Sequence, residues 1–224
     1  MLVNMKKVAV VLSGCGYLDG SEIREAVGVL WALSAQNSDV QCFAPDTAQA
    51  DVVDHVEGEP VKGESRNMMR EAARIARGKI KPLDQLDASQ FQALILPGGQ
   101  GAAKNLSDFA TKGSEAKVIA PLQKAFEAFH AARKPIGLVC IAPALGALAF
   151  KGKGIQLTVG QHGEAAQEIE KLGQKHVVCA ANGCHVDTSF RVVSTPAYMY
   201  DDAPLSQIFT GIQKLVQEVL RLAV

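Results

Sequence analysis

The chain has 224 residues, of which 48% are hydrophobic and 21% are charged, so it is long enough to bury the core of one domain. Lys plus Arg and Asp plus Glu number 23 each, and this balance argues against nucleic acid, an anionic membrane or a polyanionic substrate as partner. The apolar run at 8–12 is too short for a signal-peptide core or a membrane span. Five cysteines without framework spacing suit a reducing compartment. We expect a single domain over residues 1–224 in a cytoplasmic protein.

The first half of the chain alternates between patterns typical of buried strands and of helices. We predict strands at 7–13, 40–45 and 92–96, and helices at 21–36 and 64–78. Glycine-rich turns follow the first and third of these strands, at 14–16 and 97–99. The charged stretch 49–63 reads as loops with room for a short hairpin.

The second half continues the alternation with shorter elements. We predict helices at 117–134, 142–150, 164–173 and 206–223, and strands at 135–139, 155–160, 176–180, 185–188 and 190–196, some of them antiparallel. Strands that alternate with helices along a chain favour an α/β fold in which a mostly parallel central sheet is covered by helices on both faces.

Cys140 stands where the strand 135–139 turns directly into the helix 142–150. Such an elbow holds the residue at its apex in strained backbone geometry at the carboxyl edge of the sheet, where α/β folds bind ligands. The free N–H groups of the helix that follows would favour thiolate over thiol. A nucleophile is one interpretation, and a cysteine packed in the core at a strand end is the other.

Three loops at strand carboxyl ends should meet near this thiol: 13–22, 97–105 and 140–143. The first of them carries Glu22. A functional interpretation makes Glu22 a hydrogen-bond partner of the Cys140 sulfur and a proton carrier, which requires burial to raise its pKa. The alternative is an ordinary acidic residue in the first turn of a helix, capped by Ser21 or Asp19.

Gly98 and Gly99 follow the predicted strand 92–96. Without Cβ atoms, they would let backbone N–H groups approach a ligand closely, as an oxyanion hole requires, although they fit a simple tight turn equally well. A nucleotide site is excluded. The segment GGQGAAKN lacks the Gly-Lys-Ser/Thr ending of a phosphate loop, and SGCGYLDG lacks the dinucleotide fingerprint.

Segments spread over nearly the whole chain resemble the ElbB-like glyoxalase branch of the PfpI/ThiJ superfamily, which has a class I glutamine amidotransferase-like fold. They are SGCGYLDGSEIREA, CFAPD, GESRN, ARIARGKI, LPGGQGAAKNL, GLVCIAPAL and VVSTPAYM. The resemblance implies a flavodoxin-like three-layer sandwich, Cys140 as nucleophile with Glu22 as its acidic neighbour, an oxyanion hole from the N–H groups of Gly99 and Ile141, and a homodimer. It also implies a glyoxalase III-like activity, or protein deglycation, without glutathione or metal.

The residues are consistent with that chemistry. Addition of the Cys140 thiolate to an aldehyde of a small dicarbonyl gives an alkoxide that backbone N–H groups can stabilise. Glu22 could then move a proton between the adjacent carbons, which yields a thioester that water cleaves to a 2-hydroxy acid. No cofactor is required.

Two further residues are weaker candidates. Many members of the superfamily carry a histidine about twenty residues after the nucleophile, whereas this chain has Gly160 near that place and His162 two residues later. His162 either reaches the site or lies on the surface at a helix start. Cys15, in the first glycine-rich turn, either lines the pocket, pairs with Cys140 on oxidation or packs in the interior, and packing is the interpretation we favour.

We expect no metal site. His176, Cys179, Cys184, His185 and Asp187 are close in sequence, but their spacing departs from the paired clips of structural zinc sites. In addition, neighbouring residues 184 and 185 would point to opposite faces of a strand.

Three functions from different classes fit these observations. The first is the glyoxalase or deglycase with a Cys140 nucleophile. The second is a non-enzymatic redox sensor or chaperone-like protein in which Cys140 is oxidised. The third is a class I glutamine amidotransferase, placed last because the chain contains no downstream His-Pro-Glu set and reads STPAYM in that region.

Overall fold

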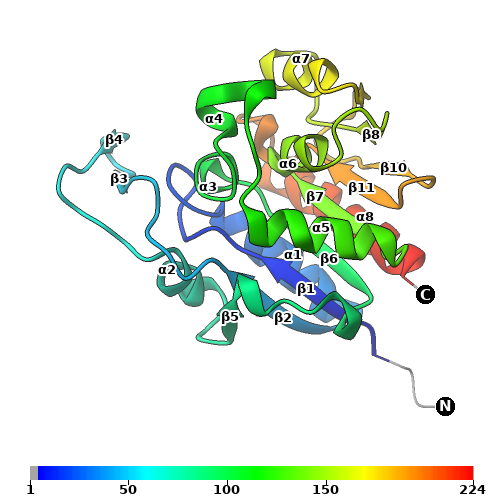
Figure 1. The fold of residues 1–224 in the computed structure, drawn as a ribbon, viewed down its shortest axis with the longest axis horizontal. Coiled ribbons are helices and arrows are strands. Elements are labelled where there is room, and N and C mark those ends of the chain that lie inside the picture. Colours follow the sequence, from blue (N-terminus) through cyan, green and yellow to red (C-terminus); the bar gives the residue numbers. More distant parts are fainter. Residues whose placement is uncertain (1–4, 224) are drawn as a thin grey trace.

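The structure is a computed structural model that describes residues 5–223. Its centre is a seven-stranded sheet in the order β10-β11-β7-β6-β1-β2-β5, parallel except that β10 runs antiparallel to β11 (Figure 1). The strands are β1 (Lys7–Val11), β2 (Asp39–Ala44), β5 (Ile80–Pro82), β6 (Ala93–Leu96), β7 (Ile136–Val139), β10 (His185–Asp187) and β11 (Val192–Thr195). The predicted α/β class with a mostly parallel sheet is confirmed.

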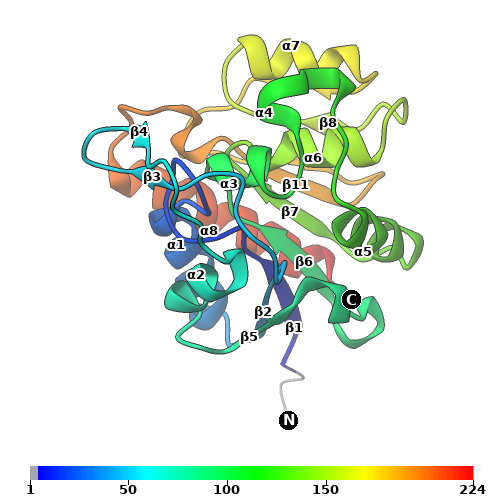
Figure 2. The ribbon, with the colours of Figure 1, turned by 60° about the vertical axis from the view of Figure 1, so that its left-hand side comes forward.

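Helices cover both faces of this sheet (Figure 2). One face carries α1 (Ile23–Ala35), α2 (Met68–Ile75) and α8 (Leu205–Leu222). The other carries α3 (Gln100–Lys104), α4 (Phe109–Lys112), α5 (Ala120–Ala131), α6 (Ala142–Ala149) and α7 (Glu164–Lys171). Short 3-10 turns occupy Leu83–Gln85, Ala88–Gln90, Gly113–Glu115 and Ala197–Met199. No helix within 5–223 has the length and apolar character needed to cross a membrane.

The central strands are apolar along their whole length because helices bury them on both sides. In β1, Val8 and Val10 pack against α1 and α8, whereas Ala9 and Val11 face the layer that contains α5 and α6. This is the alternation that a pleated strand imposes on its side chains.

Two small two-stranded sheets lie outside the main one. The hairpin of β3 (Val53–Asp54) and β4 (Glu59–Pro60) confirms the hairpin that the charged stretch allowed, and it stands away from the main sheet in Figure 1. The second is a parallel pair, β8 (Gln156–Leu157) with β9 (Lys175–His176), on either side of α7. The strands expected over 155–160 and 176–180 are therefore much shorter and do not join the central sheet.

Other elements differ from expectation for local reasons. Helix α2 begins at Met68 and not at 64, because Asn67 Oδ1 accepts a hydrogen bond from the Arg70 N–H at 2.9 Å and caps the helix there. The edge strand β5 and the one-turn helices α3 and α4 were not predicted. Elements this short form through tertiary contacts, and they leave little periodicity in the sequence.

The strand order places a crevice beside β1. After β1, β2 and β5 the chain crosses back to form β6 on the other side of β1, so the two halves of the sheet diverge between β1 and β6. Ligands bind at the carboxyl ends of the strands at such a reversal. The loops after β1, β6, β7 and β11 all open at this end of the sheet.

Phe126 on α5 tests the packing of the α5 and α6 layer. Its side chain is fully buried and lies 6.0 Å, between ring centroids, from Phe150. We expect Phe126→Ala to lower the free energy of unfolding by about 3–5 kcal/mol, because the cavity adds to the lost burial. Urea unfolding measures the change. Val56→Ala, at a side chain that is 90% exposed, is the matched control and should stay within about 0.5 kcal/mol of wild type.

Candidate active site

Cys140 is the first of the two residues that form the elbow between β7 and α6. Its backbone φ is 61°, in the left-handed region that residues other than glycine seldom adopt. The Cys140 N–H donates to the Thr195 carbonyl at 2.9 Å, so the neighbouring strand β11 holds the elbow in place. The side chain is only 7% exposed, yet it lines a pocket at the carboxyl edge of the sheet.

The sulfur of Cys140 lies among hydrogen-bond donors and a carboxyl group. The backbone N–H groups of Gly99 and Ile141 and the carboxyl group of Glu25 lie beside it, and all three act on its pKa. Burial nevertheless raises the pKa of the Cys140 thiol well above its ordinary value, Glu25 raises it further, and the two N–H groups only partly offset this. The expected resting thiolate is thus corrected to a protonated thiol, because desolvation outweighs the helix N-terminus.

Glu25, on the first turn of α1, is the acid beside the sulfur. Its Oε2 accepts the Gly98 N–H at 2.9 Å, and its Oε1 accepts the Tyr198 N–H at 3.2 Å. The residue is fully buried. Burial, with the charge of Glu22 as second cause, raises the pKa of Glu25 to about 8. At neutral pH this carboxyl group therefore holds a proton next to Cys140.

Glu22 has a different position from the one expected. It is the N-cap of α1, and its Oε2 accepts the Glu25 N–H at 2.5 Å. Ser21, one of the expected caps, instead accepts the Ser13 N–H. Glu22 still lines the pocket with Cys140, and partial burial raises its pKa. The carboxyl group beside the sulfur is thus that of Glu25, one helical turn beyond Glu22, because the Glu22 carboxylate caps the N-terminus of α1.

Gly98 and Gly99, which follow β6, have different structural roles. A Cβ at Gly98 would lie 2.4 Å from the Cys140 Cβ and 2.8 Å from Glu25 Oε2, so a side chain there would displace the pair. The Gly98 N–H is bound to Glu25 and cannot also serve an oxyanion hole, which corrects that part of the expectation. Gly99, with φ of 94°, turns its N–H toward the sulfur.

The loops after β1 and β6 are joined by backbone hydrogen bonds. The Glu22 N–H donates to the Gly98 carbonyl at 3.0 Å, and the Gly101 N–H donates to the Gly20 carbonyl at 2.9 Å. A Cβ at Gly101 would lie 2.5 Å from the Gly20 backbone, so the two loops touch without intervening side chains. This contact places α1, and with it Glu25, against the elbow.

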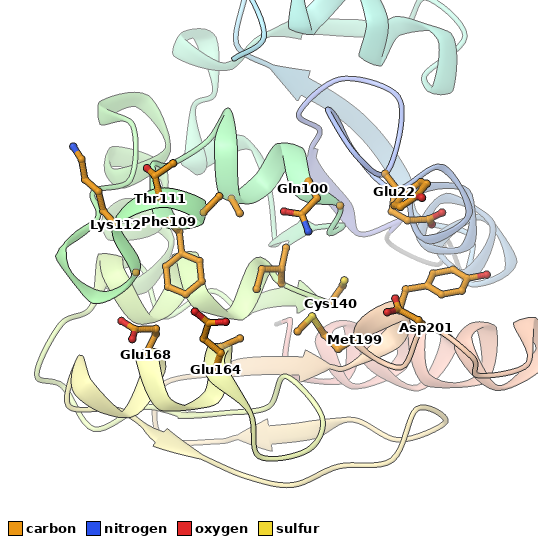
Figure 3. Close-up of a pocket in the computed structure, with 18 residues that line it drawn as sticks. Glu22, Gln100, Phe109, Thr111, Lys112, Cys140, Glu164, Glu168, Met199 and Asp201 are labelled. Carbon is orange, nitrogen blue, oxygen red and sulfur yellow. The ribbon is translucent and has the colours of Figure 1, made fainter. Parts of the chain in front are cut away.

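The pocket around Cys140 has a volume of about 650 Å³ and an acidic lining (Figure 3). Carboxylates line it from three elements: Glu22 at the start of α1, Glu164 and Glu168 on α7, and Asp201 after β11. The cation on its wall is Lys112, which forms an ion pair with Asp108 at 2.6 Å. Apolar contact comes from Phe109, Ile141 and Met199. Such a lining disfavours anions near the thiol.

The weaker candidates lie elsewhere. His162 is exposed, outside the described lining of the pocket, with its ring 5.2 Å from that of His176. Cys15 is half-buried beside α2, where Glu71 and Arg74 are the nearest charges, and burial raises its pKa. Asp187 belongs to the group of residues whose spacing argued against a metal site. Its carboxylate accepts hydrogen bonds from the backbone N–H groups of Gln156, Ser189 and Phe190.

Sequence reasoning missed Glu25 and the segment after β11. The signal for Glu25 was present: it shares a helix face with Ala26, Val29 and Leu33, and a carboxylate on a buried helix face needs a partner. No comparable signal marks Tyr198, whose contribution is a backbone N–H placed by the fold.

Comparison with known proteins identifies the family. The chain is 47% identical to the mitochondrial ES1 protein homolog of Rattus norvegicus over 96% of this chain and 84% of that protein. It is 48% identical to the mitochondrial glutamine amidotransferase-like class 1 domain-containing protein 3 of Homo sapiens, over 96% and 83%. The chain belongs to the ES1 family of glutamine amidotransferase-like class 1 proteins. No family model matches it.

Solved structures show the same amidotransferase-like fold. The isoprenoid biosynthesis protein with amidotransferase-like domain of Ehrlichia chaffeensis is 38% identical, with a TM-score of 0.90 over 97% of this chain and 99% of that one. Drosophila melanogaster DJ-1beta is 16% identical and shares the fold, with a TM-score of 0.55 over 97% and 96%. The fold that the resemblance implied is thus confirmed.

The expected cytoplasmic location is wrong. The names of the ES1 relatives from Rattus norvegicus, Homo sapiens and Danio rerio each carry the word mitochondrial. The short apolar run at 8–12, on which the expectation was based, tests for a secretory signal or a membrane span and does not discriminate among compartments inside the cell.

The proton on Glu25 predicts a pH dependence of stability. Its folded pKa of about 8 exceeds the ordinary 4.5, so between these values the folded state binds a proton that the unfolded state has lost. Stability from this group is full below the lower pKa and is lost as pH rises through the upper one, at about 1.4 kcal/mol per pH unit.

We expect Glu25→Gln to remove that slope in urea unfolding followed from about pH 5 to about pH 8. The measured quantity is the change of the free energy of unfolding with pH, and not its absolute value. The absolute value changes at every pH, because glutamine can accept only one of the two backbone N–H groups. Glu127→Gln, on α5, is the control and should keep the wild-type slope. Equal slopes in Glu25→Gln and wild type would contradict the protonated buried acid.

Proposed function

We propose that this protein is a cofactor-independent glyoxalase III-like enzyme that converts glyoxal, and also methylglyoxal, to the corresponding 2-hydroxy acid through a Cys140 adduct. The observation that carries the proposal is the buried acid Glu25 beside Cys140, whose thiol lines an open pocket. A thiol with an adjacent proton carrier suits reversible addition to an aldehyde. Deglycation of proteins would use the same adduct chemistry.

The first step forms the carbon–sulfur bond. In molecules whose pair of Cys140 and Glu25 has lost one proton, the sulfur adds to one aldehyde carbon of glyoxal, the C=O electron pair moves to oxygen, and the thiol proton passes to the ionised Glu25 carboxylate. The N–H groups of Gly99 and Ile141, which lie beside the sulfur, would then stabilise the alkoxide. Protonation of that oxygen gives a hemithioacetal.

The second step is an internal redox change. The carbon bonded to sulfur loses its proton, an enediol forms, and the neighbouring carbon gains a proton, so one carbon is oxidised and the other reduced. Glu22, a pocket carboxylate with a raised pKa, is the group we assign to this transfer. The product is a thioester, and water cleaves it to glycolate and regenerates the thiol. The sum is glyoxal plus water to glycolate.

The charge of the pocket supports an uncharged substrate. Four carboxylates line it, and its lysine is already paired with Asp108. Glyoxal and methylglyoxal are neutral and enter without electrostatic penalty, whereas the hydroxy acid product is an anion that this lining repels. Release of product is therefore favoured over its retention.

Two finer expectations belong to the same proposal. Assignment to the ElbB-like branch has the support of the 38% identical Ehrlichia chaffeensis protein, which is described as an isoprenoid biosynthesis protein. The homodimer rests on the resemblance alone and stays a prediction.

Redox sensing through Cys140 has less support. Sensor cysteines combine a low pKa with exposure, whereas this thiol is 7% exposed and burial raises its pKa. Negligible turnover together with selective oxidation of Cys140 would favour that alternative over the enzyme.

Turnover of glyoxal without glutathione tests the proposal. We expect Cys140→Ser to abolish it, and Glu25→Gln and Glu22→Gln each to lower kcat/KM by about 100-fold or more, the usual contribution of a proton carrier. Glu127→Gln is the surface control and should match wild type. Full activity in Cys140→Ser, with folding verified by circular dichroism, would overturn the mechanism.

The rate of Cys140 alkylation by iodoacetamide separates the two acids. In wild type the rate should rise as pH passes about 8, when the pair of Cys140 and Glu25 loses its first proton. Glu25→Gln should lose this inflection. Glu22→Gln should move it to lower pH, because the charge of Glu22 contributes to the raised pKa of Glu25.

Mass spectrometry of the peptide that contains Cys140 identifies the alkylated thiol and separates it from the other four cysteines. An identical pH profile in all three proteins would show that Glu25 does not share its proton with the sulfur.

A further inference from the structure

Two histidines and a glutamate meet on the side of α7 away from the pocket. His162 lies in the loop before α7, Glu170 in the last turn of α7, and His176 at the end of β9. One ligand atom from each of these residues lies within 4.8 Å of the other two. The catalytic proposal assigns no role to any of them.

His176 provides an independent sign of a missing partner. Both of its ring nitrogens are shielded from solvent and have no hydrogen-bond partner among residues 5–223. A neutral imidazole carries one donor and one acceptor, and buried polar atoms of this kind are normally satisfied. The ring of His162 stands edge-on to it, with 64° between the ring planes, and does not hydrogen-bond to it.

The backbone around the three residues is held in place. The Gly160 N–H donates to Thr158 Oγ1 at 3.0 Å, and its carbonyl accepts the Cys179 N–H at 3.2 Å, which anchors the loop that carries His162. His176 is held by the pairing of β9 with β8. The chain passes from one anchored segment to the other through α7, so all three ligands come from one short β-α-β unit.

The side chains of His162 and Glu170 are exposed, and neither belongs to the ion pairs found within the described part of the chain. They are free to move toward His176. Zinc bonds of about 2.0–2.2 Å place tetrahedral donors roughly 3.4 Å apart, so a modest side-chain rotation closes the arrangement. Two imidazoles and a carboxylate suit a borderline divalent ion and leave a fourth position for water.

We propose that His162, Glu170 and His176 form a binding site for a divalent transition metal ion, with zinc as the ion that fits the donors best. An ion there would join the loop before α7, the end of α7 and β9. Glu164 and Glu168, on the same helix, line the pocket, so metal binding would also fix the α7 wall of that pocket.

Zinc titration of the reduced full-length protein by isothermal calorimetry tests the site, with Co²⁺ absorption to report the donors. We expect one ion per chain and no thiolate-to-cobalt charge-transfer band. His162→Ala and Glu170→Gln should each weaken zinc binding by more than about 100-fold, the upper end of what loss of a residue that only supports a ligand costs. Zinc should raise the thermal unfolding midpoint of wild type and not that of the double variant.

The double variant keeps the half-buried His176, so its fold should persist. Matched controls are Glu127→Gln and His185→Gln, the latter at another half-buried histidine with a shielded, unpartnered ring nitrogen within 5–223. Both should bind zinc like wild type. Unchanged affinity in the double variant, or a thiolate band in the cobalt spectrum, would overturn the site. Because the readout is metal affinity, the result is independent of the proposed glyoxalase reaction.

Discussion

The buried contact between Glu25 and Cys140 is the one on which the pocket depends. One carboxyl group on α1 accepts backbone N–H groups from the loops that follow β6 and β11 and lies beside the elbow that follows β7, and water cannot replace these partners. A buried polar group left without its partners costs about 1–3 kcal/mol, so all of the bonds are formed together or the site opens. A single side chain thus fixes the relative positions of three strand ends.

The same contact explains why the Cys140 thiol is not nucleophilic in the resting protein. Burial disfavours a negative charge on either member of the pair, and so both are protonated at neutral pH. The sulfur becomes nucleophilic when the pair has lost one proton, because the ionised Glu25 carboxylate beside it can then accept the thiol proton. Buried acids of this kind lower stability at neutral pH, which is a cost that a catalytic role would account for.

Much of the fold could be predicted from the sequence, because long apolar strands and amphipathic helices carry periodic signals. The short elements β5, α3 and α4 could not, since contacts with distant segments create them. The elbow at Cys140 was predictable from its neighbours. The choice between Glu22 and Glu25 was not predictable, because it depends on which of the two carboxylates caps the N-terminus of α1. The cluster of His162 and His176 was not predictable either, because it depends on the path of α7.

The acidic pocket around a shielded thiol determines which chemical probes can label this protein selectively. A negatively charged electrophile such as iodoacetate is repelled by the lining, whereas a neutral or cationic one of similar size is not. The half-buried cysteines Cys15, Cys179 and Cys184 lie outside that lining. Reagent charge therefore distinguishes the elbow thiol from its neighbours, and a covalent inhibitor of the site has to be small, uncharged or cationic, and able to reach a sulfur that is almost covered.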